Sequence, residues 1–273
     1  MFDAIFDMLS YPFMQRALAV GILVSLCAAL LGVSLVLRRY SMIGDGLSHV
    51  GFGALAIAAV ANLAPLKVAI PVVVIAAFFL LRLSEDSRLK GDSAIAVIST
   101  SALAFGVLIL SVGGGVNTDV YNYMFGSIYA MSEDDVVLSL SLSFIVLVLF
   151  ILFYNRIFSV TFDETFARAG GIRVNAYTML TAVLTAVTIV LGMRMMGAML
   201  ISALIIFPAL TAMRVFKTFR AVTIAAALIA VVSFAVGITL SYLFDAPGGA
   251  TVVLVNLGAM LLFAGIGAIG KRK

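Results

Sequence analysis

The only histidine of the chain lies one helical turn away from a carboxylate. His49 follows Asp45 by four residues, in a segment that begins with Arg38 and Arg39. In a helix this spacing places the imidazole and the carboxylate on one face. A nitrogen and an oxygen ligand suit zinc, manganese or iron, whereas copper(I) favours sulfur ligands. The pair therefore predicts half of a divalent-metal site.

A structural interpretation of the same pair competes with the metal site. Asp45 could cap the N-terminus of a membrane-spanning helix, and His49 could make a polar contact between helices. An ionised aspartate inside a membrane costs on the order of 2.5–3.5 kcal/mol on insertion scales, so it needs a partner or an aqueous path. Arg38 and Arg39 could be such partners, and a passing cation could be another. The residues alone leave both interpretations open.

Other side chains that can bind metals or partners have simpler explanations. Thioethers ligate soft metals, but methionines in an apolar chain mostly fill packing gaps. Serine and threonine within apolar runs mostly form hydrogen bonds between helices, and isolated polar residues at span ends serve as caps, ligands or docking groups. The residues concerned are Met193, Met195, Met196, Met199, Ser99, Thr100, Ser101, Ser202, Asp119, Asp245 and Asn256.

The composition requires a membrane as the solvent for most of the chain. Hydrophobic residues make up 64% of the 273 residues and charged residues 11%, and the mean hydropathy is +1.23. A soluble domain needs a far more polar surface. We expect one all-α, polytopic membrane domain over residues 1–273, with about nine spans at 16–37, 46–64, 66–82, 94–112, 135–154, 176–193, 197–213, 221–242 and 250–270.

The basic residues predict how these spans are oriented. Of the 17 lysines and arginines, only Arg16, Lys67 and Arg194 fall on one set of alternate links, so the other 14 lie on the opposite set. Basic links stay in the cytoplasm, which places the N-terminus outside and the C-terminus in the cytoplasm. The sixth and seventh runs are short and could instead form a re-entrant pair, because little besides Arg194 and glycine separates them.

One cytoplasmic link has the pattern of a short amphipathic helix. Between residues 162 and 172 it begins with acidic residues and ends with glycines, which suit the two ends of a helix. Phe162, Phe166 and Ala169 would fall on one face. Such a helix could rest on the membrane surface or dock into a cytoplasmic partner.

Several functions are excluded by what the sequence lacks. It contains no Gly-x-x-x-x-Gly-Lys-Ser/Thr loop, so the chain does not hydrolyse ATP itself. Its single histidine leaves no separate Ser/His/Asp set, so we expect no enzyme. The net charge of +4 comes from basic residues at span ends, which are orientation signals facing lipid and indicate no nucleic-acid partner.

Six stretches of the sequence follow one another in a telling order: Arg38–His49, Gly91–Ile95, Tyr123–Ile128, Phe162–Ile172, Gly197–Leu204 with Pro208, and Asp245–Ala250. Each is weak by itself, but six in order are specific. Together, over essentially the whole chain, they resemble the permease subunits of bacterial zinc/manganese/iron ABC importers. One departure is the glycine pair 170–171, where a single glycine after a larger residue is expected.

The resemblance implies a type II ABC importer permease in the bacterial inner membrane. It implies a homodimer, a cytoplasmic ATPase subunit beneath each copy, and an extracellular or periplasmic metal-binding protein. Zinc, manganese or iron would be the transported ion, with no permanently bound cofactor and with Asp45 and His49 on its path. The 162–172 link would couple to the ATPase through Phe162, Asp163, Glu164, Phe166, Ala167, Gly170 and Gly171.

Two other functions remain as alternatives at this stage. A secondary metal transporter driven by an ion gradient would usually carry inverted repeats with buried carboxylates at matching positions. No such pairing is evident in the sequence. A purely structural membrane protein would leave Asp45 and His49 without an explanation.

Overall fold

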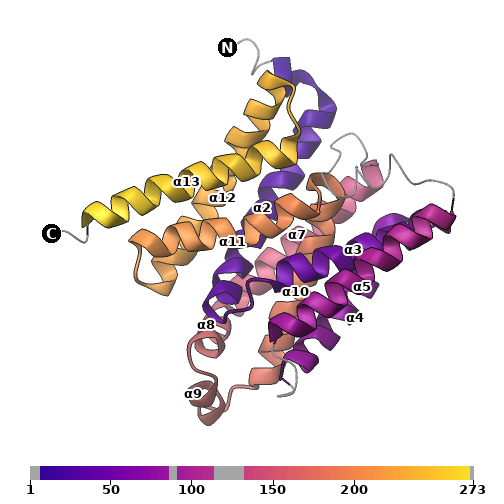
Figure 1. The fold of residues 1–273 in the computed structure, drawn as a ribbon. Helices are drawn as coiled ribbons and strands as arrows, with labels where there is room; N and C mark the ends of the chain where they lie inside the picture. The colour runs from indigo at the N-terminus through magenta and orange to yellow at the C-terminus, as the bar shows by residue number, and fades with distance from the viewer. Residues whose placement is uncertain (1–6, 86–90, 114–131, 271–273) are drawn as a thin grey trace.

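The structure is a computed structural model that describes residues 7–85, 91–113 and 132–270. Throughout these residues the chain forms α-helices and no strand (Figure 1). The helices are α2 (Pro12–Leu37), α3 (Ile43–Val60), α4 (Pro65–Glu85), α5 (Gly91–Val112), α7 (Glu133–Leu152), α8 (Tyr154–Phe162), α9 (Glu164–Ala169), α10 (Val174–Met196), α11 (Ala198–Val215), α12 (Phe219–Phe244) and α13 (Gly248–Gly270).

Each of the nine predicted spans coincides with one long helix. Eight described helices are long and apolar enough to cross a membrane, and the apolar part of α4, Pro65–Leu81, is somewhat shorter. The prediction of an all-α polytopic protein is therefore confirmed. The stretch Tyr123–Ile128 lies outside the described residues, as does Asp119.

The sixth and seventh runs form two separate helices joined at one residue. α10 has 23 residues and α11 has 18, and both meet the length of a span. Gly197 joins them with φ at 84°, a conformation that residues with a Cβ rarely adopt. The helix lengths favour two full spans over a re-entrant pair.

Helix α2 lies at the centre of the bundle. It packs against α7, α8, α10, α11 and α12, and most of its side chains are buried. At Gly32 the backbones of α2 and α11 approach so closely that an added Cβ would lie 2.0 Å from the carbonyl oxygen of Ile205. Because lipid gives no hydrophobic drive for helices to associate, such backbone contacts supply much of the packing energy.

The links with few basic residues contain Arg16, Lys67 and Arg194, and all three lie near the start of α7. Ser132 caps this helix and its first turn is acidic. Arg16 forms an ion pair with Glu133 at 2.6 Å, and Arg194 lies 3.9 Å from Asp135. Lys67 lines a cavity together with Asp134, Asp135 and Arg194. The exceptions to the basic asymmetry thus have acidic neighbours in the fold.

We predict that Gly32→Ala destabilises the protein, because the new methyl group meets a backbone oxygen that cannot rotate away. The expected loss is about 1–3 kcal/mol, the usual cost of overpacking. The matched control is Gly258→Ala on α13, where an added Cβ has no atom within 4 Å. Thermal unfolding in detergent measures both variants, and equal midpoints would contradict the close contact between α2 and α11.

Candidate functional site

Asp45 and His49 lie together at the start of α3. The carboxylate Oδ2 is 3.6 Å from the imidazole Nε2, and the side chains are 44% and 23% exposed. Asp45 does not cap the helix, because the capping position is Met42. Its place in the first turn still suits a negative charge, since the N-terminal end of a helix carries partial positive charge. The two side chains are therefore accessible, and one side of the pair is left uncovered.

That uncovered side opens into a cavity of about 420 Å³ between α3 and α5. Its walls consist of Met42, Asp45, His49, Ile95, Ala96, Ser99, Thr100 and Leu103. Among the described residues, no group of three or more His, Cys, Asp or Glu side chains could hold a metal ion. Among the described residues, the strong metal ligands that line this cavity are thus one carboxylate, Asp45, and one imidazole, His49.

Ser99 and Thr100 extend the polar wall of the cavity. Their hydroxyl groups donate to the carbonyls of Ile95 and Ala96, at 2.6 and 2.8 Å. Since the hydrogens are engaged within α5, oxygen lone pairs remain for a ligand in the cavity. From the sequence alone, both residues are expected to form hydrogen bonds between helices. No pattern in the sequence links them to Asp45, because only the packing of α5 on α3 does so.

Glycines hold α3 and α5 at this short separation. An added Cβ at Gly53 would lie 2.9 Å from the carbonyl oxygen of Ala102, and one at Gly106 would lie 3.0 Å from the Cα of Gly53. At Gly46 it would meet Ile95 at 2.6 Å. The small residues bring the α5 wall opposite Asp45 and His49.

The other candidate ligands lie elsewhere. Met193, Met195 and Met196 are at most 4% exposed, which agrees with packing, and Met199 is 41% exposed. The buried Asn256 donates to the carbonyl of Val252 at 3.0 Å within α13. Asp245 ends α12 in a left-handed conformation with φ at 49°. None of these residues lines the cavity beside Asp45.

The predicted helix over residues 162–172 is divided in the structure. Phe162 is the last residue of α8, and Asp163 caps α9 by accepting from the Phe166 N–H at 2.8 Å. The expectation of one face with Phe162, Phe166 and Ala169 was therefore wrong. The acidic cap interrupts the helix, and the buried residue of α9 is Ala167, which packs against Val160 and Val174.

The two phenylalanines of this region have different surroundings. Phe162 contacts the rings of Phe158 and Phe219. Phe166 is 75% exposed on α9, which lies with α8 at the end of the bundle away from the N-terminus (Figure 1). After α9, Gly171 takes a φ of 78° while Gly170 does not need a positive φ. Phe166 is thus the more exposed of the two, and Phe162, which is 59% exposed, packs against other rings.

Comparison with known proteins gives one family and several relatives. The model of the ABC 3 transport family matches residues 10–266. The manganese transport system membrane protein MntC of Halalkalibacterium halodurans is 32% identical, over 94% of this chain and 87% of that protein. The high-affinity zinc uptake system membrane protein ZnuB of Haemophilus influenzae is 31% identical, over 88% and 92%.

A solved structure has the same fold. PsaBC from Streptococcus pneumoniae, solved in complex with Fab, contains a chain that matches with a TM-score of 0.86 and 28% identity. The match covers 96% of this chain and 95% of that one. The helical arrangement in Figure 1 is therefore that of the matched chain of PsaBC.

We predict that water reaches the cavity between α3 and α5. The native Cys27 is the only cysteine and is 1% exposed, so it should not react with a charged thiol reagent. Thr100→Cys should react, because its side chain lines the open cavity. Thr185→Cys, at a position 1% exposed, is the matched control. Mass spectrometry after labelling measures each variant, and an unreactive Thr100→Cys would mean that the cavity is closed to water.

Proposed function

This chain belongs to the ABC 3 transport family, and from that premise we propose that it is the membrane-spanning permease subunit of an ATP-driven importer for zinc, manganese or iron. It is a multi-pass protein of the bacterial inner membrane and a non-catalytic subunit. Membership of an ABC family also decides against a transporter driven by an ion gradient. The observation that carries the metal assignment is the Asp45–His49 pair beside an open cavity.

In this proposal Asp45 and His49 are transient ligands on the metal path. A carboxylate and an imidazole bind first-row divalent ions, and an exposed pair can take up and release an ion without unfolding its surroundings. Because one chain offers two such ligands, a second copy related by two-fold symmetry would supply the matching pair. A homodimer of permease domains, each spanning residues 1–273, would thus complete a four-ligand site.

The proposed importer has one partner on each side of the membrane. The basic asymmetry supports an N-terminus outside and a C-terminus in the cytoplasm. A metal-binding protein would deliver the ion outside the cell or in the periplasm. A separate ATPase subunit would bind in the cytoplasm, because this chain has no nucleotide-binding loop. The ion itself is the cargo, and the proposal includes no permanent cofactor.

Helix α9 is the proposed contact with that ATPase. It presents the exposed Phe166 and is anchored by the buried Ala167. An aromatic residue that projects from a fixed support is the usual anchor of a protein interface. Asp163 and Glu164 at the start of α9 and Gly170 and Gly171 after it delimit the contact, with Phe162 supporting it from α8.

We predict that Asp45→Ala and His49→Ala each abolish metal uptake while the protein still folds. Loss of one ligand should weaken binding by about tenfold or more, as a missing coordination bond or its support does, and the apolar packing of α3 is unchanged. The control is Ser101→Ala on α5, which does not line the cavity. Uptake of radioactive manganese and zinc by cells measures all three variants. Uptake at the wild-type rate in both ligand variants would overturn the site.

A second variant tests the coupling contact. We predict that Phe166→Asp prevents association with the ATPase, because a charge buried in an interface costs several kcal/mol, by rough estimate. Phe244→Asp is the matched control, since Phe244 is 76% exposed against 75% for Phe166 and belongs to α12. Copurification of the ATPase measures the effect. If both variants retain the ATPase equally, α9 is a surface helix that takes no part in docking the ATPase.

A further inference from the structure

We infer that Arg38 is a positioning residue that ties the proposed ATPase contact on α9 to the helix that carries Asp45 and His49. The inference rests on the proposed function, because it assigns a route for work within the proposed importer. The sequence alone marks Arg38 as a possible partner of Asp45 and as an orientation signal. The structure gives its side chain specific partners on two other helices.

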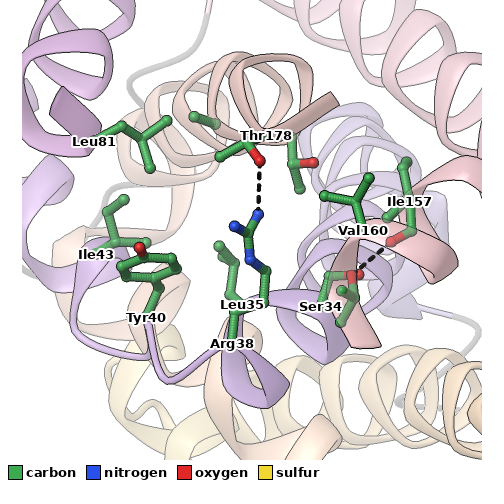
Figure 2. Close-up of a pocket in the computed structure, with 12 residues that line it drawn as sticks. Ser34, Leu35, Arg38, Tyr40, Ile43, Leu81, Ile157, Val160 and Thr178 are labelled. Carbon is green, nitrogen blue, oxygen red and sulfur yellow. Dashed lines mark hydrogen bonds between the residues drawn. The ribbon is translucent and has the colours of Figure 1, made fainter. Parts of the chain in front are cut away.

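The guanidinium group of Arg38 joins three parts of the fold, and Figure 2 shows its contact with Thr178. One nitrogen donates to Thr178 Oγ1 on α10 at 3.0 Å, and another forms an ion pair with Glu164 on α9. The group also lies over the ring of Tyr40, 5.5 Å from its centroid, within the range of a cation–π contact. The side chain is 13% exposed. Arg38 is thus a largely buried charge shared by helices distant in sequence.

A short, hydrogen-bonded turn connects Arg38 to the metal-binding pair. Arg38 ends α2, and α3 begins five residues later at Ile43. Within the turn the Tyr40 N–H donates to the carbonyl of Leu35 at 2.9 Å, and Arg39 has a left-handed φ of 63°. The Ile43 N–H donates to the carbonyl of Tyr40 at 3.0 Å. Because this turn is short and hydrogen-bonded, we expect a displacement of Arg38 to move the start of α3.

The partners of Arg38 allow α9 to separate from it without leaving a buried charge alone. Glu164 is 48% exposed, so water can solvate its carboxylate when the pair opens. Arg38 would keep its contacts with Thr178 and Tyr40. An ion pair with one exposed member contributes little to folding stability. The pair can therefore open and close during a transport cycle at small energetic cost.

The cavity around the guanidinium offers a second polar position. Ser34 lines it together with Arg38, Thr178 and Thr181. Ser34 Oγ is buried and has no hydrogen-bond partner among the described residues. Its oxygen can accept a hydrogen bond, so the cavity holds an unused acceptor beside the guanidinium. A buried charge with alternative partners is the kind of two-state element through which coupling travels.

The test compares Arg38→Gln and Glu164→Gln with wild type, each assembled with the ATPase subunit and the metal-binding protein in lipid vesicles. Manganese uptake and metal-stimulated ATP hydrolysis should both fall about tenfold in each variant, the effect of one network residue on coupling. In Arg38→Gln, basal hydrolysis and manganese binding should stay within about twofold of wild type. The matched control is Arg39→Gln, which removes the same charge from an exposed side chain in the same turn. It should behave as wild type.

The double variant separates coupling from general damage. If Arg38 and Glu164 act as a pair, Arg38→Gln/Glu164→Gln should lose no more than the larger single variant. Additive losses of transport in the double variant would overturn the inference. A parallel loss of manganese binding, basal hydrolysis and assembly in Arg38→Gln would also overturn it and leave Arg38 a packing residue. The proposed function would be overturned if vesicles with the wild-type chain took up neither manganese, zinc nor iron. Transport by wild type and Arg38→Gln at equal rates would overturn the role of Arg38 alone.

Discussion

Close approach of helix backbones is the constraint on which this bundle depends. Helices in a bilayer gain little from burying apolar side chains against each other, because lipid is equally apolar. What remains is contact between surfaces, and it is greatest where no Cβ separates the backbones. Gly32 brings α2 onto α11, and Gly53 and Gly106 bring α3 onto α5. The second contact also determines the width of the cavity beside His49, so packing and site share one physical cause.

The polar side chains of the bundle fall into two classes by their surroundings. Arg194 with Asp135 and Arg38 with Thr178 are partly buried and have partners on other helices. Such pairs carry little net stability, since desolvation offsets much of the attraction. Asp45 and His49 differ, because they face an open cavity and their one ion pair among the described residues is with each other.

The arrangement brings the proposed metal-binding pair and the proposed ATPase contact within reach of one side chain. Arg38 lies at the end of α2, Glu164 on α9 and Asp45 on α3. A turn of five residues separates α2 from α3. A permease without a nucleotide site must receive work through such a link. In this proposal the turn between α2 and α3 transmits a displacement of Arg38 to α3. The ion pair between Arg38 and Glu164 permits that displacement because it can open.

The sequence by itself determined the helices, because membrane spans depend on local hydropathy and length. All nine predicted runs became helices, and the resemblance to metal ABC permeases agreed with the family found by comparison. The spacing of Asp45 and His49 likewise depends only on the geometry of one helix. The tertiary structure alone decided that Ser99 and Thr100 line their cavity, that Asp163 divides α8 from α9, and that Arg38 reaches Glu164. These features rest on contacts between residues far apart in sequence, which no local pattern encodes.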